Sequence, residues 1–252
     1  MDFTVKKYKE LLESLANKDY VFQTFERFLL TPAEKSIILR HDVDLLPQNS
    51  LTFAKIQAEN NIKGTYYFRA VPESWDKCVI EEIASLGHEI GYHYECLTTS
   101  NGDLKMGIAD FEINLQKLRK IVPVTTICMH GSPASRYDSK DLWKKYSYKD
   151  FCLIGEPYFD IDFEKVFYLT DTGRKWDGDK VSVRDKVNSG FSLFFHSTED
   201  IISAANSRQL PKQIMFTFHP QRWNDNKYFW YREYINQNIK NIIKKYFFVK
   251  KR

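Results

Sequence analysis

Residues 36–47 read SIILRHDVDLLP, an apolar run followed by charged residues and a proline. The apolar run at 37–39 suits a buried strand, which then ends in charged residues. Because side chains alternate along a strand, Asp42 and Asp44 should point the same way. Two such carboxylates repel each other and are costly to desolvate, unless a cation lies between them or one holds a proton. The alternative is structural, with Asp44 capping the next helix and Asp42 paired with Arg40.

The composition indicates one large folded domain. The chain has 252 residues, of which 43% are hydrophobic and 15% aromatic, and this is enough for a sizeable core. We expect a single domain over residues 1–252, with its core at 36–223 and a helical extension at each end. The 37 basic and 33 acidic residues nearly balance, at a net charge of +4, so composition does not indicate a nucleic-acid partner.

Three features of the sequence favour a cytoplasmic protein. The N-terminal residues lack the apolar region of a signal peptide. No apolar run approaches the roughly 20 residues that a membrane span needs. The four cysteines, at positions 78, 96, 128 and 152, are scattered without paired spacing, which is typical of a reducing compartment. We therefore expect a cytoplasmic location.

Strand-like and helix-like segments alternate along the chain. We expect strands at 36–41, 65–69, 88–94, 125–129, 150–154, 166–169 and 214–218, and helices at 3–16, 48–60, 79–86, 108–122 and 199–208. This order predicts an α/β fold with a mainly parallel sheet or barrel.

Polar residues recur at the ends of the predicted strands. They are Asp42, Asp44, Arg69, His93, Glu95, His130, Asp171 and His219. In a parallel barrel the carboxyl ends of the strands meet on one face, where active sites lie. Residues so far apart in the sequence should therefore converge on one site.

The convergent side chains have the character of metal ligands. In the segment 87–95, strand alternation places His93 with Glu95 on one face and His88 on the other. An imidazole beside carboxylates suits a divalent transition metal, typically zinc. A lone histidine is more often structural, but histidine and aspartate at matched strand ends favour the ligand interpretation. For His130 and His219 the residues alone leave open a general acid, a ligand or a structural role.

Four motifs resemble those of a known family. RHDVD at 40–44, GTYYF at 64–68, GHEIGYH at 87–93 and FHP at 218–220 follow the order of the polysaccharide deacetylases, carbohydrate esterase family 4, with the nodulation-deacetylase homology fold. The resemblance covers roughly residues 36–223. It implies a distorted (β/α) barrel with about seven parallel strands. It also implies a metal-dependent hydrolase that removes acetyl groups from sugars by cleaving a linear amide bond.

The resemblance also implies roles for individual residues. Asp42 matches the family's catalytic base, and Asp44 and His93 match its metal ligands. His219 matches the histidine that protonates the leaving amine, and Trp176 is the counterpart of an aromatic residue of the acetyl pocket. The side chains that we expect to contact substrate are Arg40, Asp171, Trp176 and Trp223.

This sequence departs from the family pattern at two places. Leu97 stands where a second metal-binding histidine is expected, so the third ligand falls to Glu95 or His130, with Cys96 less favoured. The family's Arg-x-Pro motif is not evident, so Arg40 or another arginine, Arg136, is left to orient Asp42. The implied metal is zinc, with cobalt, nickel or manganese as alternatives.

The predicted function is deacetylation of an N-acetylated sugar, a sugar nucleotide or a lipid-linked glycan. The alternative is a non-catalytic sugar-binding member of the same fold, and it is motivated by Leu97. A phosphoester hydrolase is disfavoured, because no phosphate-binding glycine-rich loop is evident. The C-terminal residues 240–252 hold six basic residues and three aromatic ones. They could contact a membrane surface, but we favour a final amphipathic helix with a solvated basic face.

Overall fold

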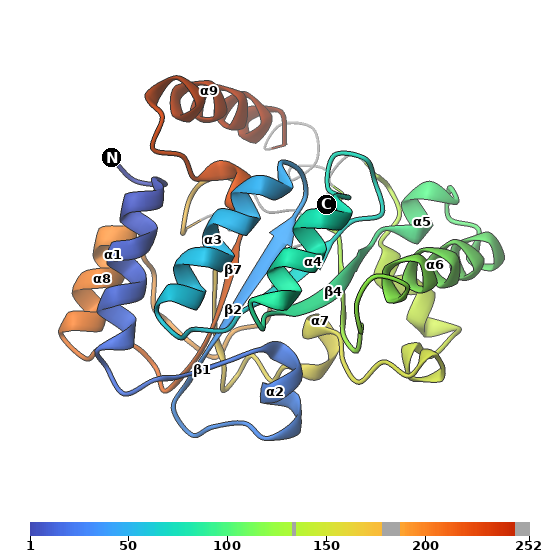
Figure 1. Ribbon diagram of the computed structural model, residues 1–252, viewed down its shortest axis with the longest axis horizontal. Coiled ribbons are helices and arrows are strands. Elements are labelled where there is room, and N and C mark those ends of the chain that lie inside the picture. Colours follow the sequence, from blue (N-terminus) through green and yellow to red (C-terminus); the bar gives the residue numbers. More distant parts are fainter. Residues whose placement is uncertain (133–134, 178–186, 245–252) are drawn as a thin grey trace.

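The computed structural model describes residues 1–132, 135–177 and 187–244, and within them seven parallel strands form one sheet (Figure 1). The strands follow the order β5-β4-β3-β2-β7-β6, and β1 pairs with β2 beside this path. Their bounds are β1 Val21–Gln23, β2 Ser36–Val43, β3 Thr65–Phe68, β4 Glu89–Tyr94, β5 Ile127–Met129, β6 Phe167–Thr170 and β7 Gln213–Phe218. The sheet is curled into a half-barrel with flanking helices. The predicted α/β fold with about seven parallel strands is confirmed.

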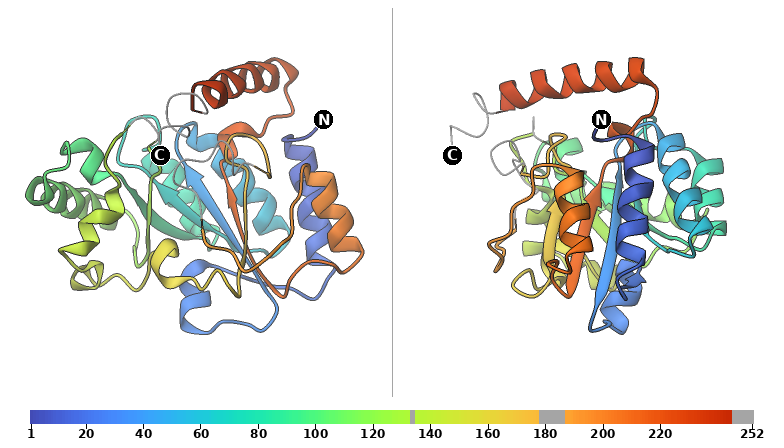
Figure 2. Two further views of the ribbon diagram at one scale, coloured as in Figure 1. Left: turned by 180° about the vertical axis from the view of Figure 1, so that it is seen from behind. Right: turned by 90° about the vertical axis from the view of Figure 1, so that its left-hand side faces the viewer.

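Nine α-helices and three 3-10 helices are found in the described residues. The α-helices are α1 Val5–Ala16, α2 Phe25–Leu30, α3 Pro47–Glu59, α4 Lys77–Ser85, α5 Cys96–Thr99, α6 Leu104–Arg119, α7 Pro157–Asp160, α8 Thr198–Asn206 and α9 Lys227–Lys244. The 3-10 helices are η1 Ser139–Lys144, η2 Tyr148–Phe151 and η4 Pro220–Arg222. Helix α1 packs beside α8 and α3 beside α4, while α9 lies across one end of the molecule (Figure 2). None of the described helices has the length and apolarity needed to cross a bilayer.

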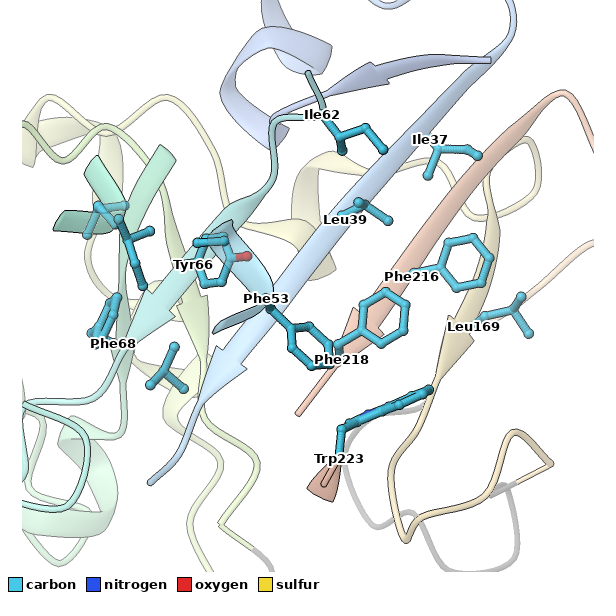
Figure 3. Close-up of a cluster of buried hydrophobic side chains, with 14 of the residues drawn as sticks. Ile37, Leu39, Phe53, Ile62, Tyr66, Phe68, Leu169, Phe216, Phe218 and Trp223 are labelled. Atoms are coloured by element: carbon cyan, nitrogen blue, oxygen red, sulfur yellow. The ribbon is translucent and has the colours of Figure 1, made fainter. Parts of the chain in front are cut away.

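Strand β2 is the centre of the sheet and is buried along its whole length. It pairs with β7 on one side, and on the other with β1 along its first half and β3 along its second half. Because both faces are covered, its apolar part reads as a continuous run rather than an alternation. Ile37 and Leu39 face the larger core, together with aromatic rings from α3 and β7 (Figure 3). Ile38 faces the opposite way, into a smaller cluster that contains Tyr67 and Met215.

The longer predicted elements match the structure, but one predicted strand is wrong and several short elements were not predicted. Residues 150–154 were expected to form a strand, and this prediction is wrong, because η2 occupies 148–151 and Cys152 then adopts a left-handed backbone with φ of 55°. Nearby, only an isolated bridge joins Thr126 to Gly155. Strand β1, the helices α2, α5 and α7 and the 3-10 helix η1 were not predicted, because they are short and lack a long periodic pattern.

Two histidines are buried on the helix-covered side of the sheet in their neutral form. His41 donates from Nδ1 to the Thr65 carbonyl oxygen at 3.0 Å, and its Nε2 lies 2.8 Å from the Gln57 amide nitrogen. The Nδ1 atom of His88 accepts a hydrogen bond from the Gly64 amide, and its Nε2 donates to the Ala54 carbonyl, both at 3.0 Å. Burial lowers the pKa of His41 to about 3 and that of His88 to about 4.

These neutral histidines predict a loss of stability in acid. A histidine whose folded pKa lies below its unfolded value of about 6.5 takes up a proton more readily in the unfolded chain. The stability contributed by His88 is therefore complete above pH 6.5 and is lost as the pH falls toward 4. Replacing His88→Asn should make the free energy of unfolding fall less steeply between pH 6.5 and 5, by a difference approaching about 1.4 kcal/mol per pH unit.

Urea unfolding at several pH values measures this slope. Gln116→Asn, at an exposed position on α6, is the control, since it changes no titratable group. Equal slopes for wild type and His88→Asn would show that His88 is not held neutral by the fold.

Candidate active site

The carboxyl ends of four strands bring the predicted residues together. Asp42 lies near the end of β2 and Asp44 follows that strand. His93 is in β4, His130 follows β5, and His219 follows β7. Side chains alternate along β2, so Ile38 lies on the side of the sheet opposite the larger core. Asp42 and Asp44 have the same parity as Ile38 and therefore point to that same side, where the histidines lie.

Three side chains form a group that could hold a metal ion. The Oδ1 atom of Asp44 lies 3.7 Å from Nε2 of His93 and 3.5 Å from Nε2 of His130. One ligand atom from each of the three residues lies within 4.8 Å of the other two. An oxygen and two imidazole nitrogens are a donor set that zinc prefers, and three protein ligands leave coordination positions for water and substrate.

The hydrogen bonds of the two histidines fix which nitrogen faces the site. The Nδ1 atom of His93 lies 2.9 Å from the Cys128 carbonyl oxygen, which can only accept, so Nδ1 carries the proton. The Nδ1 atom of His130 lies 2.9 Å from a Glu95 oxygen and donates to it. Burial also lowers the pKa of His93 to about 4. The Nε2 lone pair of each histidine is thus free to bind a cation.

The surroundings of Asp44 show whether these residues fit a metal ion. Its Oδ1 is buried and has no hydrogen-bond partner within the described residues, whereas Oδ2 accepts from Gln221 at 3.2 Å. Burial opposes its charge, but the three neighbouring histidines outweigh this and hold the pKa of Asp44 below its usual value. A buried, ionised oxygen without a partner is costly unless a cation contacts it. The residues present therefore fit the divalent metal that the motifs imply.

Glu95 and His130, the two candidates for third ligand, form a pair. One Glu95 oxygen accepts from Arg69 at 2.6 Å, and the other accepts from His130. Burial opposes the charge of Glu95, but the hydrogen bond from His130 and the charge of Arg69 lower its pKa to about 2. The geometry favours His130 as ligand and Glu95 as the residue that orients it. Leu97 and Cys96 are buried on α5 and belong to no ligand group of the described chain.

Asp42 is held by an arginine two residues before it. Arg40 donates from Nε and from one terminal nitrogen to the two Asp42 oxygens, at 2.8 and 2.7 Å. Burial opposes the charge of Asp42, but Arg40 and His93 more than offset this and lower its pKa. The structural alternative, in which Asp42 pairs with Arg40 and Asp44 caps the next helix, is therefore correct for Asp42 only. Asp42 does pair with Arg40, but Asp44 does not cap α3, whose N-cap is Leu46 without a side-chain bond.

A second group of possible ligands overlaps the first. Asp42, His93 and Cys128 are also mutually close and all buried. However, both oxygens of Asp42 are engaged by Arg40, whereas Asp44 has a free oxygen. The group containing Asp44 is therefore the better metal site. Cys128 was not predicted, although it lies opposite His93 in the register of β4 and β5.

His219 is anchored from behind by a buried aspartate. Asp171 lies 2.6 Å from Nδ1 of His219 and also accepts hydrogen bonds from Arg222 and from the Trp223 indole. Asp171 thus fixes the ring, and Nε2 of His219 lies 3.8 Å from an oxygen of Asp44. Burial and Arg222 oppose protonation, but Asp171 and Asp44 outweigh them and raise the pKa of His219.

The four residues predicted to contact substrate are all buried. Arg40, Asp171, Trp176 and Trp223 are at most 5% exposed. Arg40 and Asp171 orient Asp42 and His219, and Trp223 bonds to Asp171. Trp176 donates to Thr198 and packs on Phe218 in the core. Direct substrate contact is therefore corrected to a supporting role, because these side chains offer almost no surface.

Comparisons with known proteins give distant structural neighbours only. No known family model matches the sequence, and no curated protein matches it either. Similar solved structures include a CE4 family pseudoenzyme from Bacillus anthracis, with 13% identity, a TM-score of 0.42, and coverage of 83% of this chain and 62% of that one. A Streptococcus mutans CE4 esterase has 12% identity, a TM-score of 0.46 and 88% coverage of both chains. A Bacillus subtilis peptidoglycan deacetylase has 13% identity, a TM-score of 0.41, and coverage of 85% and 98%.

These solved structures are described as family 4 carbohydrate esterases and a peptidoglycan deacetylase. The chain spans less than two thirds of the length of the pseudoenzyme. Because every TM-score is below 0.5, the fold and the chemistry are argued from this chain's own strands and side chains.

The pairing of Glu95 with His130 makes a prediction about metal affinity. Glu95→Gln should weaken zinc binding by about 10- to 100-fold, because an orienting hydrogen bond to a ligand is typically worth this much. His130→Ala should weaken binding further, because it removes the ligand itself. Calorimetric titration of zinc into metal-free protein measures both effects.

Glu81→Gln on α4 is the matched control for the charge change, since Glu81 is exposed. The opposite order, with Glu95→Gln more damaging than His130→Ala, would make Glu95 the ligand.

Proposed function

We propose that this protein is a metal-dependent hydrolase that removes an acetyl group, in amide linkage, from a sugar. The observation that carries the proposal is the arrangement of Asp42 and His219 about the Asp44–His93–His130 group. Asp42 lies 3.6 Å from Nε2 of His93, and His219 lies 3.8 Å from Asp44. Each is fixed by a partner that faces away from the group. A base and an acid beside one metal site are what amide hydrolysis requires.

The proposed ligands are Asp44, His93 and His130, and the proposed ion is zinc. When bound, a divalent ion supplies Lewis-acid polarisation of the acetyl carbonyl and makes water more acidic. The remaining chemistry belongs to the protein's own side chains.

Asp42 would act as the general base. Its low pKa keeps it ionised in the neutral range, and Arg40 holds both of its oxygens in place. It would accept the proton of the attacking water. Its placement near His93 keeps that proton transfer close to the metal group.

His219 would act as the general acid. Because Asp171 occupies Nδ1, only Nε2 faces the site, and the raised pKa of His219 favours a proton there. This proton would pass to the nitrogen that leaves with the sugar. Without it the amine would depart as an unstable anion.

The competing hypothesis is a non-catalytic sugar-binding protein. It was motivated by Leu97, which replaces an expected metal-binding histidine. In the structure His130, from the neighbouring strand β5, offers a nitrogen in the same group as Asp44 and His93. This favours an intact metal site, and with it the enzyme.

The substitution Asp42→Asn separates the two hypotheses. It should lower kcat for deacetylation of an N-acetylhexosamine oligomer by about 100-fold or more, because general-base steps contribute about 10²- to 10⁴-fold. Zinc affinity should change little, since Asp42 is not in the ligand group. The measurements are amine release and zinc titration on the same preparation.

Asp44→Asn is the contrasting variant and should lose zinc together with activity. Asp150→Asn, at an exposed position, should behave as wild type. Wild-type turnover by zinc-loaded Asp42→Asn would exclude Asp42 as the base.

A further inference from the structure

Helix α9 buries polar residues against the protein and leaves most of its apolar residues exposed to solvent. The inward residues include Gln237 and Asn241, which are 5% and 7% exposed. Asn241 donates to the Gly173 carbonyl at 2.8 Å and accepts from Gln237 at 2.9 Å. A surface helix normally shows the reverse arrangement, with its apolar stripe facing the core.

Most outward residues of α9 are apolar and form one long face, with Arg232 and Asn236 exposed among them. We call this the outer face of α9, and its members are Tyr228, Phe229, Tyr231, Tyr234, Ile235, Ile239, Ile242 and Ile243, each at least 45% exposed. Tyr228, Tyr231, Ile235, Ile239 and Ile242 follow one another at steps of three or four residues, so they lie along one side of the helix. No other segment of the described chain lies over this side (Figure 2).

Specific contacts hold α9 in this orientation. The Trp230 indole donates to the Asp2 carbonyl at 2.7 Å. Arg174 donates to the Trp230 carbonyl at 2.9 Å, and its guanidinium lies 4.1 Å from the Trp230 ring. The polar side is therefore bonded to the domain, and the apolar side is left outward.

The charge of the C-terminal segment indicates which kind of surface the outer face of α9 contacts. Residues 227–252 contain eight basic residues and one acidic residue, a net charge of +7, although the whole chain has only +4. The other 226 residues therefore carry a net charge of −3. A basic segment with an outward aromatic and aliphatic face is typical of helices that lie in the interface of an anionic bilayer.

We propose that α9 docks this protein on an anionic membrane surface through its outer face. The helix lies in the plane of the interface and does not cross it, in keeping with its composition. A solvated basic face was expected for residues 240–252. In the described part of that segment Lys240 is exposed, but Ile242 and Ile243 are exposed as well, so the solvent-facing side there is not purely basic. Residues 245–252 lie outside the described chain, and for them the expectation stays a prediction.

The position of α9 connects the docking surface to the site. Gly173 and Arg174, which bond to α9, lie two and three residues after Asp171, the anchor of His219. Strand β2 points toward the end of the molecule at which α9 lies (Figure 1). Docking would thus hold the site next to the membrane. If the proposed function is right, the substrate class is an N-acetylated glycan carried on a lipid.

Vesicle flotation tests the docking surface without any use of activity. The probes are vesicles of phosphatidylcholine alone and vesicles with about one third phosphatidylglycerol. Wild type should float with the anionic vesicles and much less with the neutral ones. The double variant Ile235→Glu/Ile239→Glu should lose at least tenfold in apparent affinity, because apolar contact is lost and two negative charges are added.

Thr52→Glu/Gln116→Glu makes the same charge change at exposed positions on α3 and α6 and should float like wild type. Circular dichroism and urea unfolding confirm that the variants are folded. Absence of wild-type flotation, or equal flotation of the Ile235/Ile239 variant, would overturn the proposal. A solution dimer that this variant dissociates, without vesicle binding, would also overturn it and assign the face to a second copy of the chain.

The substrate class is tested with zinc-loaded enzyme on two acetylated substrates. A soluble N-acetylhexosamine oligomer should be turned over equally by wild type and the Ile235/Ile239 variant. A lipid-linked N-acetylhexosamine in anionic vesicles should be turned over at least tenfold more slowly by the variant. An equal rate on the vesicle substrate would overturn the lipid-linked assignment, whereas inactivity of wild type on both would count against the proposed function and leave the flotation result standing.

Discussion

The repulsion between Asp42 and Asp44 at the end of β2 is the constraint on which the rest of the site depends. Both carboxylates lie at the carboxyl end of a buried strand, and desolvation opposes both charges. The two carboxylates have different hydrogen-bond partners. Arg40 neutralises Asp42 through two hydrogen bonds, whereas Asp44 keeps an oxygen free among imidazole nitrogens. One residue thereby becomes suited to proton transfer and the other to binding a cation.

Each side chain of the site is in turn fixed by a neighbour. Glu95 orients His130, Asp171 orients His219, and the Cys128 carbonyl orients His93. In every case the partner occupies Nδ1 and leaves Nε2 toward the carboxylates. Such outer partners fix tautomer and ring direction, and they raise the basicity of metal-binding histidines. The site therefore gains its geometry from the rigid ends of several strands rather than from one loop.

Strand alternation was enough to predict that Asp42 and Asp44 share a face, because a period of two is a local property. The choice of His130 over Glu95 could not be predicted, since the two lie 35 residues apart and their pairing depends on the register of β4 and β5. Trp176 and Trp223 were predicted to contact substrate but are buried. The sequence alone does not distinguish an aromatic residue that lines a pocket from one that packs in the core. The outward direction of the apolar side of α9 depends on polar contacts such as that of Asn241 with Gly173.

The central claim is that Asp44, His93 and His130 together bind a divalent ion while Asp42 stays with Arg40. Anomalous diffraction at the zinc edge from zinc-loaded crystals tests it most directly. We expect one strong peak about 2.0–2.2 Å from Asp44 Oδ1 and from Nε2 of His93 and His130. A peak bound instead by Asp42 and Cys128, or no peak at saturating zinc, would contradict the account.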